Sequence, residues 1–324
     1  MSEAQLQYQQ WLRSKQVQVA SDLVTTTNDT NLVVAGWGCV AKSDIERGTV
    51  LFSIPREACF GAAATDNEDE EDDDADDPTT RDTQMDLAIS ILQRRQKQKQ
   101  QCLDNNNNDE SNEEDWSPFL NLLTPPPHGL PWTWDHEFRH AMLRGTELER
   151  VVESKIKRIS TEYEQILKQK EQHGLSSITY QEYVNACEIV ASHTNPWFGV
   201  SMVPFNTTLN WDKAPNVEFD LEEEEEEEDC PDNNNHSETC QRIVGRATCN
   251  IKKGQELVQS YGASVADLVY RYGFAPSSLE DCDGMDGDVV SIDLADILTI
   301  AQETKKGKTH RLNSETLNLK TRQQ

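Results

Sequence analysis

The sequence of 324 residues contains no long hydrophobic run. No stretch approaches the roughly 20 consecutive apolar residues that a membrane-spanning helix needs. The first 20 residues are polar and rich in glutamine, unlike a secretory signal peptide. The sequence therefore predicts a soluble intracellular protein without a membrane partner, in the cytoplasm or the nucleus, with a plastid location left open.

Paired cysteines are also missing. Eight cysteines are scattered along the chain, and none stands in a Cys-x-x-Cys pair or at zinc-binding spacing with histidine. This pattern predicts free thiols in a reducing compartment and no structural metal.

Basic residues are scarce: 30 Lys and Arg stand against 58 Asp and Glu, for a net charge of −28. Residues 66–77, 104–115 and 222–229 hold ten, six and eight acidic residues and no basic one. Without these 24 acids the net charge of −28 becomes −4. Such runs repel themselves and bury no apolar surface, so we expect disordered inserts, either padding or tethers for basic partners. The lack of a basic face argues against nucleic-acid binding.

Apolar residues spaced three or four apart predict four helices, over residues 5–25, 83–101, about 154–172 or from an earlier start, and about 179–192. A capping box is expected at Thr83 and Asp86. The third helix has a continuous apolar stripe, made of Leu148, Val152, Ile156, Ile159, Tyr163 and Ile166.

The remaining segments have β-prone residues separated by turns. Strands are expected at residues 32–34, 39–41 and 50–55, with turns at 36–38 and 44–48. Further along the chain we expect a rigid apolar loop over 116–127, short strands and turns over 202–276, and one strand at 289–294.

Two features could carry chemistry. The turn Gly36-Trp37-Gly38 lets backbone approach a ligand closely, but a plain hairpin turn explains it as well. Glycines and aromatic residues cluster from residue 260 to 274, and such clusters are more often core packing than a pocket. Neither feature decides the function alone.

Four blocks in order along the chain resemble SET-domain lysine methyltransferases of the Rubisco and ribosomal-protein subgroup. They are Gly36-x-Gly38 to Ile54-Pro55, Trp116-x-Pro-Phe-Leu to Leu148, Met202-Val203-Pro204 to Leu209-Asn210, and Gly254-Gln255-Glu256-Leu257 to Ser260-Tyr261-Gly262 and Arg271-Tyr272-Gly273-Phe274. The resemblance implies an α+β SET-domain fold with small curved β-sheets, a knot-like crossing and a helical insert. It places a helical lead at 1–31, the SET domain at 32–276 with its insert at about 83–192, and a short tail at 277–324.

The resemblance also implies an S-adenosylmethionine-dependent protein-lysine N-methyltransferase. Backbone groups of Ala35, Gly36 and Trp37 are expected at the amino-acid end of the cofactor. Asn210 is expected to hydrogen-bond the cofactor, and Tyr261 to lie at the point of methyl transfer.

Tyr272 and Phe274 are expected to form the wall of the lysine channel. The expected partner is a protein that carries the target lysine, such as a ribosomal protein or a histone, and the enzyme is expected to be a monomer.

Three positions depart from the family pattern. Thr207 replaces an Asp, and Trp211 replaces a His, although Trp211 could stack near the adenine. His193 replaces an Arg whose guanidinium would offer two donors in a fixed geometry to the cofactor carboxylate.

The 48 residues after Pro276 are too polar for the family's helical docking domain, which suggests a truncated or reduced member. A catalytically weak or inactive SET-like binding module, and an unrelated acidic scaffold, therefore remain alternatives.

Overall fold

The computed structural model describes residues 3–33, 36–61, 78–103, 115–170, 172–175, 177–224, 240–262 and 264–276; for 78–82, 101–103, 224 and 240 it describes the backbone alone. All of these belong to one compact unit spanning residues 1–286. The strand expected at 289–294 and most of the three acidic runs lie outside the described residues.

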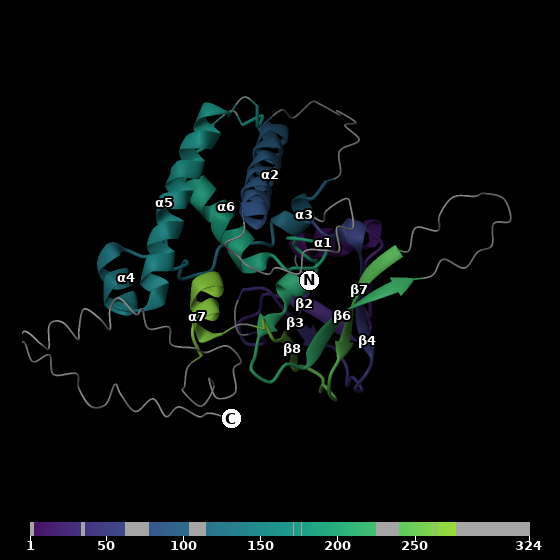
Figure 1. Cartoon of the computed structure of the whole chain (residues 1–324). Coiled ribbons are helices and arrows are strands. Elements are labelled where there is room, and N and C mark those ends of the chain that lie inside the picture. The colour runs from purple at the N-terminus through teal and green to yellow at the C-terminus, as the bar shows by residue number, and fades with distance from the viewer. Residues whose placement is uncertain are drawn as a thin grey trace, which may run out of the picture. The chain divides into compact units, whose positions relative to one another are not determined.

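The described strands form two four-stranded sheets (Figure 1). The first is antiparallel throughout, in the order β1 (Gln18–Val19), β4 (Val50–Pro55), β7 (Cys240–Ala247) and β6 (Val217–Glu224). The second has the order β2 (Val24–Thr27), β3 (Gly38–Ala41), β8 (Glu256–Gln259) and β5 (Asn210–Trp211). Within it, β5 and β8 are parallel, with Asn210 opposite Val258 and Trp211 opposite Gln259. The third and fourth motif blocks therefore lie side by side.

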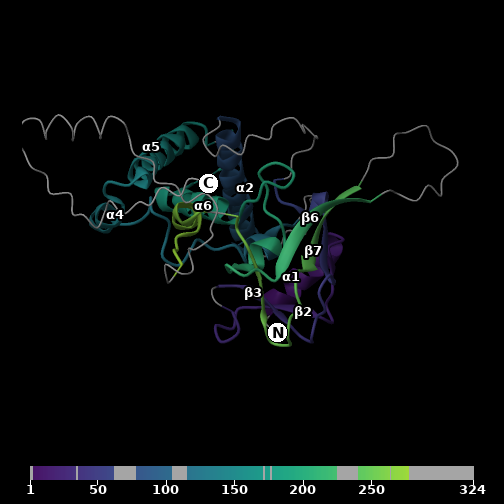
Figure 2. The same ribbon diagram turned by 60° about the horizontal axis from the view of Figure 1, so that its bottom comes forward.

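The long helices come from the middle of the chain. They are α2 (Pro78–Leu103), α4 (His136–Leu143), α5 (Glu147–Lys168) and α6 (Tyr180–His193), with the short α3 (Ser117–Leu120) between α2 and α4. The stripe predicted on α5 is confirmed, because Val152, Ile159 and Ile166 are buried and the other three members pack against the core. The helix α2 packs on α6, as both ribbon views show (Figure 2).

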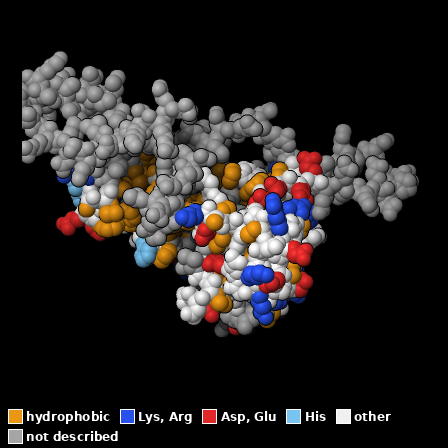
Figure 3. All heavy atoms as spheres, turned by 90° about the horizontal axis from the view of Figure 1, so that it is seen from below, with side chains coloured by type: hydrophobic (Ala, Val, Ile, Leu, Met, Phe, Trp, Pro, Cys, Tyr) orange, Lys and Arg blue, Asp and Glu red, His pale blue; other side chains and the backbone are white. Residues whose placement is uncertain are grey.

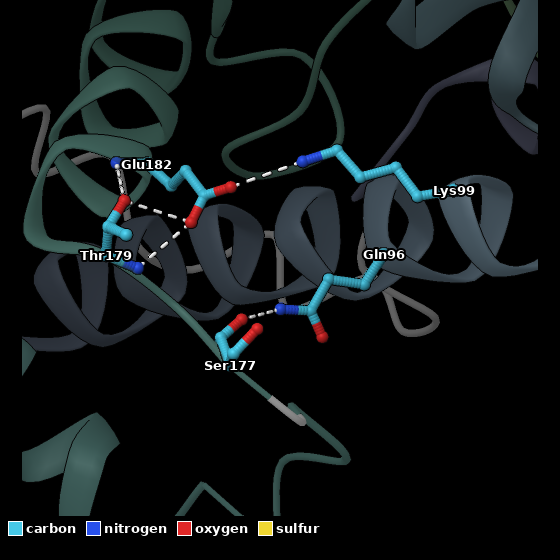
Figure 4. Close-up of polar contacts among 5 residues, drawn as sticks. All are labelled: Gln96, Lys99, Ser177, Thr179 and Glu182. Carbon is cyan, nitrogen blue, oxygen red and sulfur yellow. Dashed lines mark hydrogen bonds and ion pairs between the residues drawn. The ribbon is translucent and has the colours of Figure 1, made fainter.

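The start of α6 is fixed by a capping box, shown in Figure 4. The hydroxyl of Thr179 accepts a hydrogen bond from the Glu182 backbone N–H, and the Glu182 carboxylate accepts one from the Thr179 backbone N–H. Lys99 of α2 pairs with the same carboxylate at 3.2 Å, and Gln96 donates to the Ser177 carbonyl. The capping box satisfies N–H groups that the first helical turn leaves open.

Aromatic side chains join the N-terminal helix α1 (Glu3–Ser14) to the rest of the core. Tyr8 and Trp11 are buried and stack on Phe119 of α3, with the Trp11 and Phe119 ring centroids 5.4 Å apart. Phe52 of β4 stacks on Phe205 at 4.6 Å. These contacts connect residues from four distant stretches of sequence, so that the core is a product of the tertiary structure.

The predicted helix over 5–25 is wrong in its second half. The helix α1 ends at Ser14, Gln16 adopts a left-handed φ of 56°, and the chain continues into β1 and β2. Valine and threonine are frequent from residue 17 to 27, and these β-branched residues pack better in a sheet than in a helix. Pairing of β1 with β4 and of β2 with β3 then fixes the extended form.

The strand expected at 32–34 is not formed at its described residues. Leu32 and Val33 instead donate their backbone N–H groups to the Asp29 carbonyl, and the Asp29 carboxylate accepts from Asn31. A side chain that closes its own turn competes with strand pairing. The strands expected at 39–41 and 50–55 are confirmed as β3 and β4.

Three further expectations need correction. Thr83 and Asp86 do not cap a helix, because α2 already begins at Pro78, where proline suits the first turn. Glu222 to Glu224 are not a disordered insert but the end of β6, where Glu222 lies opposite Arg242 and pairs with Arg246 of β7. The loop expected at 116–127 includes the short helix α3, and the sequence reasoning missed α4.

Two findings concern residue classes that the sequence singled out. Cys39, Cys59, Cys187 and Cys249 are free thiols, as predicted, whereas the side chains of the other four cysteines lie outside the described residues. No described helix combines the length and apolar character needed to cross a membrane.

Candidate functional site

One pocket of about 580 Å³ is lined by segments that contain the predicted site residues. Its lining comes from the turn at Gly36 and Trp37, the proline-containing loop 122–128, the C-terminal end of α6, the chain around β5, and the residues that follow β8. A volume of this size suits a small-molecule ligand, for which pockets of roughly 300–1,000 Å³ are usual.

Eight of the nine predicted site residues line this pocket; they are Gly36, Trp37, His193, Asn210, Trp211, Tyr261, Tyr272 and Phe274. The ninth, Ala35, lies outside the described residues. The structure thus brings together residues that are up to 238 positions apart in the sequence, from Gly36 to Phe274. What each residue does toward a ligand stays a prediction.

Two glycines of the first block are required for different reasons. Gly36 has a left-handed φ of +53°, and a Cβ added there would meet nothing within 4 Å, so its backbone conformation calls for glycine. A Cβ added at Gly38 would lie 2.4 Å from Val33 and 2.9 Å from the Glu256 carboxylate. Close packing between β3 and its neighbours therefore excludes a side chain at Gly38.

Asn210 connects three of the motif blocks. Its side-chain amide donates to the Glu256 carboxylate of β8 at 2.7 Å and to the Trp37 carbonyl at 3.5 Å. Glu256 was not predicted as a site residue, although a carboxylate directly before the apolar pair Leu257-Val258 of β8, five residues before Tyr261, was a signal that could have found it. The hydrogen bond holds the Asn210 amide in one orientation at the wall of the pocket.

Further amides fix the neighbouring backbone. Asn206 donates to the Gln259 side chain at 3.0 Å, and Gln259 donates back to the Asn206 carbonyl at 2.7 Å. Asn216 accepts from the Val258 N–H and donates to the Glu256 carbonyl. Because all five residues are buried or half-buried, these bonds satisfy groups that water does not reach well.

Tyr261 is held as a neutral hydrogen-bond acceptor. Its hydroxyl donates to the Leu209 carbonyl at 3.1 Å, which leaves the oxygen lone pairs to accept. Burial, followed by the nearby Tyr272 and Glu256, raises its pKa above the ordinary tyrosine value. The rings of Tyr261 and Tyr272 lie 4.3 Å apart, and burial also raises the pKa of Tyr272.

An aromatic wall continues from Tyr261. The rings of Tyr272 and Phe274 lie 6.4 Å apart, and Phe274 lies 5.6 Å from Trp211. Apolar, ring-lined surface of this kind takes up an alkyl chain and excludes water from its end. The arrangement suits the side chain of a lysine.

A glycine contact fixes the turn at the end of this wall. Gly273 has a φ of +77°, and an added Cβ would lie 2.5 Å from the Gly129 carbonyl oxygen. Next to Gly129, the Leu130 N–H and the Thr133 hydroxyl donate to the buried carboxylate of Glu188 of α6, at 2.9 and 2.8 Å. Desolvation raises the pKa of Glu188. The helical insert thus fixes the backbone at Gly129, which contacts Gly273 between Tyr272 and Phe274 of the aromatic wall.

Two lining residues, Thr207 and His193, depart from the family pattern. The Thr207 hydroxyl is buried and has no hydrogen-bond partner within the described part of the chain. His193 is half-buried, and desolvation lowers the pKa of its imidazole to about 4. Both therefore present neutral polar groups where the resemblance led us to expect charged ones.

The sequence also matches a family model. The model described as SET domain matches residues 36–262, more than half of the chain. This chain belongs to the SET-domain family. The expected α+β SET-domain fold is thereby confirmed.

Solved structures show the same fold. The SET domain of LSMT bound to lysine and AdoHcy superposes with a TM-score of 0.59 at 18% identity, over 85% of this chain and 58% of that one. Rubisco LSMT bound to AdoMet gives a TM-score of 0.58 at 16% identity, over 87% and 58%.

Two curated relatives are similar in sequence. The N-lysine methyltransferase setd6 of Xenopus tropicalis is 22% identical over 272 residues, which cover 77% of this chain and 53% of the relative. The N-lysine methyltransferase SETD6 of Homo sapiens is 24% identical over 290 residues, which cover 86% and 55%. The SET-domain chain thus spans little more than half the length of these relatives.

Proposed function

We propose that this SET-domain protein transfers a methyl group from S-adenosylmethionine to a lysine side-chain amine of a protein substrate. One observation carries the proposal: side chains from all four motif blocks meet around a single pocket of about 580 Å³. The relatives named as N-lysine methyltransferases point to the same chemistry.

The pocket fits the cofactor by its chemistry. It combines the left-handed turn at Gly36, an oriented amide at Asn210, an aromatic wall, and the buried Thr207 hydroxyl without a partner among the described residues. Gly36, Trp37 and Asn210 would hold the cofactor. When bound, S-adenosylmethionine supplies an electrophilic methyl group next to a sulfonium leaving group.

The residues of this chain would orient and desolvate the reacting amine. The Tyr261 oxygen is left as an acceptor, because its O–H group already donates a hydrogen bond to the Leu209 carbonyl. Tyr272 and Phe274 would line the lysine side chain and exclude water from its amine. Removal from water lowers the pKa of a lysine, which is about 10.4 in solution, and favours the neutral nucleophile. Alignment of the amine with the methyl group supplies rate enhancement without a dedicated base.

The test is transfer of a radiolabelled methyl group onto mixtures of ribosomal proteins or histones by the whole chain. We expect label on lysine, and much less label with Tyr261→Phe, which keeps the ring and removes the oxygen. Label no higher for the wild type than for Tyr261→Phe would refute the enzymatic function.

A binding module without catalysis is the second candidate. It is favoured by the departures at Thr207, Trp211 and His193, two of which replace charged groups with neutral ones. Such a module would bind S-adenosylhomocysteine in calorimetry and transfer no label. The third alternative, an unrelated acidic scaffold, is overturned by the match of residues 36–262 to the SET-domain family model.

The proposal includes a protein partner, a monomeric enzyme, and an intracellular location in the cytoplasm or nucleus. Mass spectrometry of lysine methylation in cells lacking the gene would identify the substrate. Imaging of the tagged chain tests the location, and sedimentation of the purified chain tests the oligomeric state.

A further inference from the structure

The imidazole of His193 is fixed in one tautomer. His193 is the last residue of α6, and its Nδ1 lies 3.1 Å from the Ile189 carbonyl oxygen. A carbonyl only accepts hydrogen bonds, so Nδ1 must carry the proton. The Ser192 hydroxyl lies 2.8 Å from the same nitrogen. It donates a hydrogen bond to the Glu188 backbone carbonyl, so its oxygen also acts as an acceptor toward Nδ1.

A neutral imidazole with its proton on Nδ1 has a lone pair on Nε2. No hydrogen bond from a described residue reaches Nε2, and this atom is not among the fully buried polar atoms. His193 lines the pocket and its Nδ1 is engaged within α6, so Nε2 is the ring nitrogen left for a ligand. The half-buried environment keeps the ring uncharged, with the pKa lowered to about 4.

His193 therefore offers an acceptor where an arginine would offer a fork of donors. A lone pair repels a carboxylate and attracts an ammonium group. Among the described lining residues, Lys213 is the only Lys or Arg, and it is exposed. The lining around His193 thus favours the amine over the acid group of an amino-acid ligand.

We infer that His193 recognises the α-ammonium group of the cofactor's amino-acid end through Nε2, and that this site selects its ligand by the amine rather than by the carboxylate. The inference rests on the proposed function. It assigns the carboxylate to the backbone N–H groups of the turn at Gly36 and Trp37, which lines the same pocket.

Calorimetry on the whole chain tests the inference with three probes. These are S-adenosylhomocysteine, its analogue without the α-amino group, and its analogue without the carboxylate. Loss of a hydrogen bond to a charged group predicts that the analogue without the amine binds about tenfold or more weakly than S-adenosylhomocysteine. The analogue without the carboxylate should show the smaller loss. The reverse order would overturn the inference.

Replacement of His193 by arginine should reverse the order in which the two analogues bind. His193→Arg supplies a guanidinium, so the analogue without the carboxylate should become the weakest ligand. The matched control is His136→Arg, on the exposed surface of α4 and outside the pocket, which should keep the wild-type order. If His193→Arg fails to fold, the wild-type ranking still decides. Absence of binding by S-adenosylhomocysteine itself would overturn the proposed function as well, and so differs from a reversed order.

Discussion

The helical insert and the pocket are organised by different rules. The insert, α2 to α6, consists of long helices whose buried faces repeat every three or four residues. The pocket is lined by turns, the two-residue strand β5, the loop 122–128, the end of α6 and the end of a π-helix at Leu268–Tyr272, drawn from distant parts of the sequence. Helix periodicity is a local property, whereas the pocket depends on chain segments that only the complete fold brings together.

The surface reflects the same division. Seen from below, hydrophobic side chains gather on the side of the helices, while acidic and basic side chains alternate over the side of the strands (Figure 3). Phe138 and Met142 of α4 are among the exposed apolar residues, at 48% and 58%. On this face, the helices and the strands therefore differ in surface chemistry. The comparison predicts that insert mutations act on stability and pocket mutations act on binding.

The largest effect is expected in the core of the insert. Ile159→Ala removes a side chain that is 1% exposed on α5, and the cavity should lower the free energy of unfolding by about 4 kcal/mol. Val151→Ala on the exposed face of the same helix should cost less than about 0.5 kcal/mol. Urea unfolding measures both. The affinity of folded Ile159→Ala for S-adenosylhomocysteine should match the wild type, and a large loss would show that the two regions are not separable.

The second-largest loss of stability is expected at Gly273, where the helical insert contacts the aromatic wall of the pocket. Gly273→Ala combines a left-handed φ with a contact of 2.5 Å to the Gly129 carbonyl, and should cost about 3 kcal/mol. Gly254→Ala, with a φ of +82° and no atom within 4 Å, should cost only about 1 kcal/mol. Gly273→Ala should also weaken binding of the substrate lysine, because Gly273 lies between Tyr272 and Phe274, which would line the lysine side chain. Equal losses in the two variants would mean that the contact does not matter.

His193 should make stability depend on pH. Its pKa is lowered in the folded state to about 4 from 6.5, so the unfolded chain binds more protons between these values. Stability is therefore unaffected above pH 6.5 and falls as the pH drops toward 4. Between pH 7.5 and pH 5 the loss should be about 2 kcal/mol. Denaturant unfolding at both pH values, compared with His193→Gln, isolates this residue from the carboxylates that both proteins share. An identical pH dependence would contradict the lowered pKa.

The smallest effects are expected at the surface of the insert. Thr179→Ala removes the capping box of α6 and should cost about 1 kcal/mol. Lys99→Ala removes an ion pair whose partners are 71% and 42% exposed, and should change stability by less than about 0.5 kcal/mol. Thermal unfolding of the two variants ranks them. A larger effect for Lys99→Ala would mean that the contact between α2 and α6 depends on this pair.

Local pattern predicted the insert well. The helices α5 and α6 follow from apolar spacing, and α2 from the same signal despite the error at its start. The strand β4 was found with its observed bounds, because β-branched and aromatic residues between turns favour extended chain. The errors at 15–25 and 32–33 have different causes. Pairing with other strands fixed residues 18–19 and 24–27 as extended chain, and a local turn closed by Asp29 prevented the strand at 32–33.

The sequence by itself determined the motif residues, and hence the family and the candidate chemistry, because their types and order are preserved in the chain. Only the tertiary structure decided that Asn210 is oriented by Glu256 and that the Tyr261 hydroxyl donates a hydrogen bond to the Leu209 carbonyl. Each of these contacts depends on a distance of about 3 Å between particular atoms. Such distances are set by parallel pairing of β5 with β8, which no linear spacing of residues encodes.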